Sequence, residues 1–173
     1  MKYLIVVDMQ KDFIDGALGT PEAVAILPSV VEKIKGFSGK VLCTRDTHHE
    51  NYLQTQEGKK LPVPHCIEGS EGWQLYPEIA PLVTEPPIDK PTFGSAALGA
   101  RLASENAVAP IESITLIGLC TDICVISNAL LLKAFLPETR IVVDAACCAG
   151  VTAQSHQTAL DAMRACQIEI ENA

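Results

Sequence analysis

One cysteine in the chain occupies a position where a protein can generate a thiolate. Cys124 belongs to the segment ITLIGLCTDICV, in which the apolar run Ile114–Ile117 predicts a buried strand that Gly118 ends. Thr121 and Asp122 are typical of a helix N-cap and of an acid in the first helical turn, which would put Cys124 in that turn. Unpaired backbone N–H groups and the helix dipole would then lower the pKa of the thiol and could hold an oxyanion. The alternative is that Cys124 is simply a small buried apolar side chain.

Two charged residues could serve such a thiol. Asp8 follows the apolar run Tyr3–Val7, and Lys90 comes shortly after a third strand candidate. Asp8 could take the thiol proton and later return it to a leaving amine. Lys90 would favour the thiolate and orient Asp8 through a charge-assisted hydrogen bond. Alternatively, Asp8 could cap a loop and Lys90 could be a solvated loop charge.

A second group of residues could bind a metal ion. Asp46 and His48 lie close together in one loop, with His49 beside them, and His65 lies at the far end of that loop. Two imidazoles and one carboxylate suit Zn²⁺, Fe²⁺ or Mn²⁺ and leave positions open for water or substrate. Cys66 could add a fourth ligand or could be a buried structural thiol.

Strands and helices that alternate along the chain must position these residues. The predicted strands are Tyr3–Val7, Lys40–Thr44, Leu82–Ile88, Ile114–Ile117, Arg140–Val143 and Ile168–Ile170. The predicted helices are Pro21–Lys35, Trp73–Ile79, Ser95–Ser104, a segment that ends near Phe135, and Gln154–Ala165. The segment DMQKDF, Asp8–Phe13, is expected to be a loop.

This alternation predicts a parallel sheet that helices cover on both faces. In such folds, ligands bind beyond the carboxyl ends of the strands, where the strand order reverses. Asp8, Asp46, Lys90 and Cys124 follow four successive predicted strands. They meet in one site only if those strands are neighbours in the sheet.

Length and composition exclude several classes of function. The 173 residues fit a single domain, 1–173, and 48% hydrophobic with 20% charged residues is typical of a globular protein. A net charge of −8 argues against nucleic acid or an anionic membrane surface as a partner. No apolar run could span a bilayer, the N-terminus lacks the features of a signal peptide, and the seven cysteines form no CxxC pair. These features predict a cytoplasmic protein without a membrane partner.

Five motifs together resemble the isochorismatase-like cysteine hydrolases, and among these the nicotinamidases. They are DMQKDF, RDTHHENY, PHCIEGSEG, KPTFGS and GLCTDICV, in the family's order and spread over most of the chain. The pattern GxxTDxCV is quite specific, and DxH followed by HC narrows the match to the metal-bearing branch. The resemblance implies an α/β fold in three layers, with a mostly parallel six-stranded sheet and helices on both faces.

The resemblance also implies roles for the residues that carry chemistry. Cys124 would be the nucleophile, Asp8 the proton shuttle and Lys90 the third member of a catalytic set. The metal, with zinc preferred over iron or manganese, would be held by Asp46, His48 and His65. The pyridine nitrogen of nicotinamide would sit on this metal, which would present the amide carbon to the thiolate.

The same motifs imply what surrounds the substrate. Phe13 matches an aromatic residue that packs on the substrate ring, and Gln10 matches a polar neighbour of the site. Phe93 is a looser candidate for the pocket wall. The N–H groups of Cys120 and Cys124 would form the oxyanion hole.

One further feature agrees with the family, and another departs from it. The peptide bond between Leu119 and Cys120 would be cis, as it is in the family. Nicotinamidases usually carry a Trp shortly before the HC pair, whereas the corresponding run here, LPVPHC, has no aromatic residue. The wall must therefore come from elsewhere, such as Trp73 or Tyr52, or the substrate must differ.

The predicted activity is hydrolysis of nicotinamide to nicotinic acid and ammonia through a thioester on Cys124, a step of pyridine-nucleotide salvage. One alternative is a related amidase for an N-carbamoyl compound or another heteroaromatic amide. Others are isochorismate hydrolysis, whose branch lacks the metal triad, and a catalytically silent binding module. Family members are often dimers or tetramers, so a homo-oligomer that acts on a small-molecule amide is expected.

Overall fold

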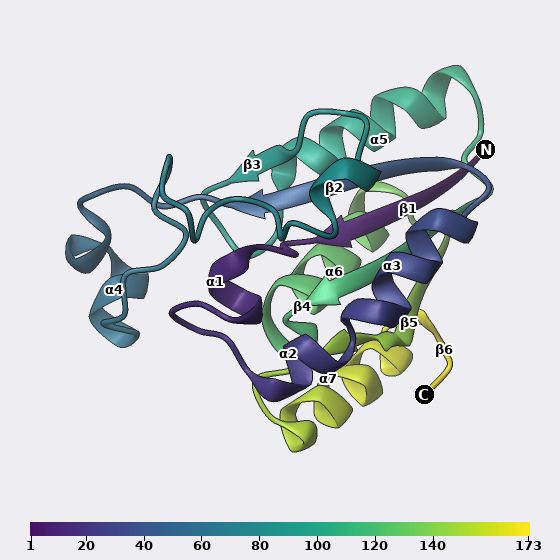
Figure 1. Ribbon diagram of the computed structural model, residues 1–173. Coiled ribbons are helices and arrows are strands. Elements are labelled where there is room, and N and C mark those ends of the chain that lie inside the picture. Colours follow the sequence, from purple (N-terminus) through teal and green to yellow (C-terminus); the bar gives the residue numbers. More distant parts are fainter.

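Six parallel strands form the sheet of the computed structural model, which describes residues 1–173 (Figure 1). The strands are β1 (Lys2–Val7), β2 (Lys40–Asp46), β3 (Ile88–Lys90), β4 (Ser113–Leu119), β5 (Arg140–Ala149) and β6 (Glu169–Glu171). They lie in the order β3-β2-β1-β4-β5-β6, and every neighbouring pair is parallel. The predicted six-stranded parallel sheet is confirmed.

Helices cover both faces of this sheet (Figure 1). One face carries α1 (Lys11–Ile14), α2 (Pro21–Ala25) and α3 (Leu27–Gly36), and the other carries α5 (Ala96–Val108), α6 (Ile126–Phe135) and α7 (Ala153–Ala165). In β1, Leu4 and Val6 enter the core with α3, while Ile5 and Val7 enter the core with α5 and α6. Apolar side chains on both sides of the central strand explain the three layers.

One short helix, α4 (Gln56–Lys60), stands apart from these layers in the long connection between β2 and β3 (Figure 1). Thr55 caps it, because its hydroxyl accepts a hydrogen bond from the Gly58 N–H at 3.0 Å. No helix of the protein is both long enough and apolar enough to cross a membrane.

The chain order reverses between β1 and β4, at the centre of the sheet. The chain runs outward from β1 through β2 to β3, and then returns to β4 and runs outward on the other side. Parallel sheets bind ligands at such a reversal, beyond the carboxyl ends of the strands. Asp46 and Lys90 end neighbouring strands and pair directly in the register. The strands that precede the four predicted site residues are therefore neighbours.

Two segments differ from the predicted helix pattern near the N-terminus. The predicted helix Pro21–Lys35 is two helices, because α2 ends at Ala25 and α3 starts at Leu27. Pro28 lacks an N–H group and cannot extend the hydrogen-bond ladder of α2, but it fits the first turn of α3. The expected loop DMQKDF contains α1, a single helical turn.

The predicted helix Trp73–Ile79 is wrong, since this segment forms turns. The Trp73 indole N–H donates to the Thr47 hydroxyl at 2.9 Å, and the Trp73 carbonyl accepts from the Gln10 side chain at 3.0 Å. These contacts hold the segment against the ends of β1 and β2. Tertiary hydrogen bonds thus override the local helical pattern.

Two predicted strands have different bounds. The candidate Leu82–Ile88 is reduced to β3, which starts only at Ile88, because Pro86 and Pro87 cannot donate hydrogen bonds to a ladder. In contrast, β5 continues past the predicted end at Val143 as far as Ala149. Its register with β4 shifts between Leu116 and Gly118, which accommodates the extra length.

Gly118 is a position where only glycine fits. It lies opposite Val7 in the central strand pair and has a φ of +114°. An added Cβ would lie 2.2 Å from the Val7 carbonyl oxygen. We expect Gly118→Ala to lower the free energy of unfolding by about 2 kcal/mol or more, measured by urea denaturation. Gly36→Ala is the matched control, because no atom lies within 4 Å of the Cβ position there. Equal unfolding free energies for the two variants would contradict this explanation.

Candidate active site

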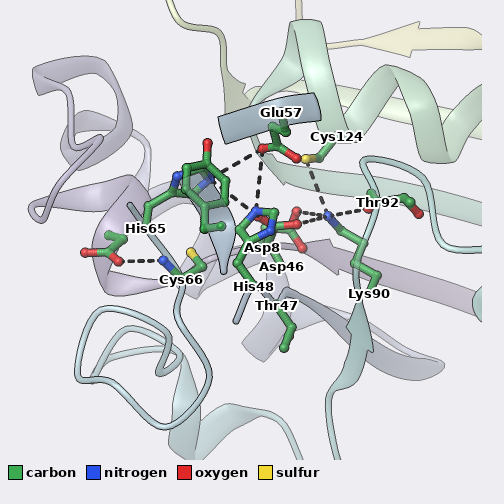
Figure 2. A network of polar contacts seen from close by, with 12 residues as sticks. Asp8, Asp46, Thr47, His48, Glu57, His65, Cys66, Lys90, Thr92 and Cys124 are labelled. Carbon is green, nitrogen blue, oxygen red and sulfur yellow. Dashed lines mark hydrogen bonds and ion pairs between the residues drawn. The ribbon is translucent and has the colours of Figure 1, made fainter. Parts of the chain in front are cut away.

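The ammonium group of Lys90 lies at the centre of the residues that follow the strands (Figure 2). Its nitrogen is 2.7 Å from Asp8 Oδ2, 3.1 Å from Asp46 Oδ1 and 3.5 Å from Cys124 Sγ. It also donates to the Thr92 carbonyl at 3.2 Å. Asp8, Lys90 and Cys124 are all buried. The structure therefore brings together the three residues predicted for nucleophilic attack and proton transfer.

Burial and opposite charge set the protonation of Lys90 and Asp8. Burial would lower the pKa of Lys90, but Asp8, Cys124 and Asp46 outweigh it and raise this pKa, so Lys90 is a cation. Burial raises the pKa of Asp8 despite the opposing effect of Lys90. A raised pKa makes Asp8 a stronger base than an exposed carboxylate. Its Oδ1 accepts from the Thr44 hydroxyl at 2.7 Å, whereas Oδ2 forms the ion pair with the Lys90 ammonium group at 2.7 Å.

Cys124 lies in a π-helical turn, Thr121–Val125, that joins β4 to α6. The predicted N-cap is wrong, because Cys120 occupies the capping position. The Thr121 hydroxyl is instead hydrogen-bonded to His156 Nδ1 at 2.8 Å. His156 therefore contacts the turn that carries the nucleophile candidate.

The predicted lowering of the Cys124 pKa is also wrong. Burial and the negative charge of Asp8 raise the pKa of this thiol well above its usual range, and Lys90 opposes them only in part. Cys124 is therefore a protonated thiol until a base removes its proton. Asp8, whose Oδ2 atom is paired with the ammonium group of Lys90, is the candidate base.

Asn128 connects two segments of the site and was not predicted. Its side-chain NH₂ donates to the Cys124 carbonyl at 2.8 Å and to the Phe93 carbonyl at 3.2 Å. Its side-chain oxygen accepts from the Ser95 N–H at 2.9 Å. Asn128 is buried, so all these bonds are shielded from water. The turn of Cys124 is thereby fixed relative to the loop that follows Lys90.

Four side chains form a group that could hold a metal ion (Figure 2). Asp46, His48, Glu57 and His65 each offer a ligand atom, and these atoms lie within 4.8 Å of one another. His48 Nε2 is 2.9 Å from Asp46 Oδ2 and 3.5 Å from Glu57 Oε1. His65 Nε2 is 3.7 Å from each of the same two oxygens. The three predicted ligands are together, and Glu57 of α4 joins them.

The environment of His48 fits a bound cation. Its Nε2 atom is buried and makes no hydrogen bond, although two carboxylates face it. Burial would lower the pKa of His48, but Asp46 and Glu57 outweigh it and raise this pKa to about 9. The site thus favours an added positive charge, which a divalent cation would supply in place of a proton. Two imidazole nitrogens and two carboxylates are a donor set for zinc, iron or manganese.

Neighbouring groups orient the candidate ligands. His65 Nδ1 lies 2.8 Å from the Val63 carbonyl, which fixes the proton on Nδ1 and leaves Nε2 as the ligand atom. Gln10 binds the backbone of Asp46 twice, since its NH₂ donates to the carbonyl at 2.8 Å and its oxygen accepts from the N–H at 2.7 Å. Gln10, which the motifs match to a polar neighbour of the site, is not among the residues that line the cavity. It positions a ligand instead.

Asp8 and Cys66 adopt the left-handed backbone conformation that is rare outside glycine, with φ values of 48° and 47°. Asp8 turns the chain out of β1 toward α1.

The N–H of Cys66 donates to the Asp12 carboxylate at 2.7 Å, which anchors the residue next to His65. The Cys66 thiol is fully buried, and burial raises its pKa. Of the two alternatives for Cys66, the structural thiol fits better.

A cavity of about 600 Å³ opens onto the reactive groups. Cys124, Asp46, His65 and Glu57 contribute its polar part, and the two predicted aromatic residues, Phe13 and Phe93, also line it. The Phe13 ring lies 5.5 Å from the His65 ring, between their centroids. The predicted pocket residues Phe13 and Phe93 therefore share one cavity with the nucleophile candidate.

The missing tryptophan is not replaced by another large aromatic side chain. Neither Trp73 nor Tyr52 lines the cavity. Tyr52 packs against the candidate ligands, tilted toward His48 with ring centroids 4.8 Å apart and edge-on to His65 with centroids 5.0 Å apart. Leu61, from the LPVPHC run, lines the cavity wall instead.

The peptide bond between Leu119 and Cys120 is cis, as the resemblance implies. Cys120 and Cys124 both line the cavity. Their N–H groups remain the predicted oxyanion hole.

The family model of the isochorismatase domain matches residues 2–172. The chain belongs to the isochorismatase family. It is 26% identical over 184 residues to the nicotinamidase/pyrazinamidase of Mycobacterium tuberculosis, and the match covers 98% of both chains. The family resemblance read from the five motifs is confirmed.

Solved structures of this family have the same fold. The crystal structure of a nicotinamidase from Bacillus subtilis has a TM-score of 0.83, 26% sequence identity, and a match that covers 99% of both chains. A pyrazinamidase of Pyrococcus horikoshii, solved in complex with zinc, has a TM-score of 0.77, 26% identity, and coverage of 98% of this chain and 97% of that one. The likeness extends over whole chains and includes a zinc-bound relative.

Sequence reasoning missed Glu57 and Asn128 in this isochorismatase-family site. Glu57 lies in a polar segment between the DxH and HC motifs, and only the folding of α4 brings it to His48 and His65. The capping sequence that starts with Thr55 could have revealed that helix. Asn128 lies one helical turn after Cys124, a spacing that allows its contact with the Cys124 carbonyl.

We expect Asp8→Asn to change the reactivity of Cys124 in opposite ways in two assays. The variant removes the negative charge that raises the thiol pKa and leaves Lys90 nearby, so that pKa falls and more thiolate exists at neutral pH. Alkylation of Cys124 by iodoacetamide at pH 7.5 should become at least about tenfold faster, since one pKa unit changes the thiolate fraction about tenfold. Amide turnover should fall about a hundredfold or more, because the proton shuttle is lost.

The control for this experiment is Asp161→Asn, an exposed position on α7. It should change neither rate. Alkylation would be followed by mass spectrometry of the peptide that contains Cys124. Slower alkylation in Asp8→Asn would show that Asp8 does not raise the thiol pKa.

Proposed function

We propose that the protein is a metal-containing cysteine amidase that hydrolyses nicotinamide to nicotinic acid and ammonia, in pyridine-nucleotide salvage. The observation that carries the proposal is the position of Lys90, whose ammonium group contacts Asp8, Cys124 and the ligand candidate Asp46 at once. Family membership and the nicotinamidase relatives support hydrolysis of an amide. By family analogy we place the enzyme in the cytoplasm as a homodimer or homotetramer.

The chain's own residues can carry out the bond changes. Asp8 takes the proton from Cys124 Sγ, and the sulfur then adds to the amide carbon. The N–H groups of Cys120 and Cys124 receive the resulting oxyanion. As the C–N bond breaks, Asp8 passes its proton to the leaving nitrogen and ammonia departs. Asp8 then takes a proton from a water molecule, whose oxygen attacks the thioester carbon. The C–S bond breaks, the carboxylic acid is released, and Asp8 returns the proton to Cys124.

Lys90 stabilises the negative charges that form during these proton transfers in a buried site. Its ammonium group lies between the carboxylate that accepts the proton and the sulfur that loses it, and its positive charge stabilises the thiolate as it forms. Because burial and Asp8 raise the pKa of the resting thiol, a base must remove its proton before the sulfur can attack. This arrangement limits side reactions of the sulfur with other electrophiles.

Asp46, His48, His65 and Glu57 are the residues that would hold a divalent metal, with zinc preferred and iron or manganese as alternatives. When bound, the metal supplies a Lewis-acidic centre for a ring nitrogen of the substrate. The zinc-bound pyrazinamidase relative supports this proposal. The same ligand group argues against isochorismate hydrolysis, because that branch lacks a metal triad.

A second candidate is an amidase of the same reaction class for another small heteroaromatic amide or an N-carbamoyl compound. The observation that favours it is the cavity wall, where Leu61 stands and no Trp or Tyr is present. The reaction class and the substrate therefore rest on different residues. They need separate experiments.

The first experiment measures ammonia release from nicotinamide by the purified protein. We expect release by the wild-type protein and a loss of at least about a thousandfold in Cys124→Ala, because the covalent step needs the sulfur. Cys166→Ala is the control, since this cysteine is exposed and outside the cavity, and it should keep full activity. Turnover that survives in Cys124→Ala would overturn the covalent mechanism. An active thiol without ammonia release would favour the second candidate.

The second experiment measures metal content after purification in the presence of zinc. We expect His48→Ala to lose the metal and to raise KM strongly, because a ligand is removed. Glu57→Gln should weaken zinc affinity by about tenfold to a hundredfold, as loss of one carboxylate ligand leaves three ligands in place. His49→Ala is the control, since its exposed ring faces only Glu68 at 3.3 Å. Unchanged zinc content in His48→Ala would exclude the ligand assignment.

A further inference from the structure

The cavity has two parts of different chemistry. Its reactive part contains Cys124, Asp46, His65 and Glu57, which are buried or half-buried. Its outer part consists of exposed side chains from separate segments, of which Leu61, Phe93 and Val151 are large and apolar and Gln56, Lys60 and Thr92 are polar. The nucleophile and the metal-ligand candidates occupy only one part of the cavity.

The outer part is unusual because its apolar side chains are exposed. Nine large hydrophobic side chains of the protein are exposed, and three of them, Leu61 (38%), Phe93 (44%) and Val151 (51%), line this one cavity. They come from the segments after α4, β3 and β5 and meet only through the fold. Apolar side chains that gather at the opening of a reactive cavity are typical of a ligand-binding surface.

The volume of the cavity also indicates a binding site for a ligand larger than one ring. Ligand pockets of about 300–1,000 Å³ bury drug-sized molecules, and this cavity has a volume of about 600 Å³. A primary amide on a single pyridine ring needs the reactive groups and the Phe13 wall. The side chains of Leu61, Phe93 and Val151 would then have no ligand atoms against them.

We infer that the outer part of the cavity is a second subsite, which binds an apolar extension, aromatic or branched alkyl, on the ring of the amide substrate. This inference rests on the proposed function, because it places the amide group at Cys124. It names a substrate class of heteroaromatic primary amides with an apolar ring substituent. Leu61, Phe93 and Val151 are the residues that select it.

The test uses binding, so that it does not depend on turnover. Titration calorimetry on Cys124→Ala, loaded with zinc, would compare nicotinamide with its 4-, 5- and 6-phenyl derivatives. We expect at least one derivative to bind about tenfold tighter or more, which is the gain expected from burial of part of a phenyl ring. If none of the phenyl derivatives binds more tightly than nicotinamide, the subsite does not exist.

Two variants assign the gain to the proposed surface. Leu61→Asp and Val151→Asp, each in the Cys124→Ala background, put a carboxylate at an exposed apolar position and should remove most of the preference for the phenyl derivative. Val108→Asp is the matched control, because Val108 is 89% exposed and does not line the cavity. An unchanged preference in both cavity variants would overturn the inference.

The outcomes separate the subsite from the proposed activity. Hydrolysis of nicotinamide by the wild-type protein together with no phenyl preference would leave the activity standing and remove the subsite. A phenyl preference that depends on Leu61 and Val151, without hydrolysis of nicotinamide, would support the subsite and replace nicotinamide with a larger amide as the substrate. Turnover gives a further comparison, made with Cys124 intact. The ratio of kcat/KM for the best phenyl derivative to kcat/KM for nicotinamide should be about tenfold lower in Leu61→Asp than in the wild-type enzyme.

Discussion

A buried ammonium group between two carboxylates and a thiol is the interaction on which the site depends. Lys90 is 1% exposed, and its charge is tolerated because Asp8 and Asp46 lie within 3.1 Å of its nitrogen. Removal of either carboxylate would leave Lys90 with one buried anionic partner in place of two, a loss that costs more in the protein interior than at an exposed ion pair. The candidate catalytic groups and the candidate metal ligands are therefore electrostatically coupled through one side chain.

Lys90 ends a three-residue edge strand, so the fold must hold that strand in another way. Arg45 of β2 binds both oxygens of Asp89, at 2.7 and 3.0 Å, across the directly paired position of the register. The Arg45 guanidinium also lies over the Trp73 ring, with its carbon 3.4 Å from the centroid. A bidentate pair and an aromatic stack thus fix the register of β3. That register places Lys90 next to Asp46.

The sequence predicted the fold and the chemical core of the site because both depend on simple rules. Buried β-branched runs gave the strands, and their parallel order brought Asp8, Asp46, Lys90 and Cys124 to one edge. The five motifs alone indicated the family that the domain match shows. Residues at the ends of regular strands are predictable because the sheet, and not the loop sequence, sets their positions.

The errors arose where a role depends on long-range contacts. A helix N-terminus alone would lower the pKa of Cys124, but burial and Asp8 outweigh it, and neither effect can be read from the local segment. Gln10 is polar and near the site in sequence, yet its side chain binds the backbone of Asp46 rather than the cavity. Glu57 reaches the metal-ligand group only through the path of a long loop. Such contacts have no signature in spacing.

The residues that would carry out the reaction and those that would select the substrate belong to different parts of this fold. The groups that would change bonds belong to strand ends and to a turn that Asn128 fixes, so they tolerate little displacement. The outer wall of the cavity comes from the segments after α4, β3 and β5, which can change without loss of the sheet. Leu61 stands in such a segment, the LPVPHC run, which has no aromatic residue. A change of substrate within one reaction class therefore requires changes in the outer wall alone, and the apolar side chains of this wall favour a substrate larger than a single ring.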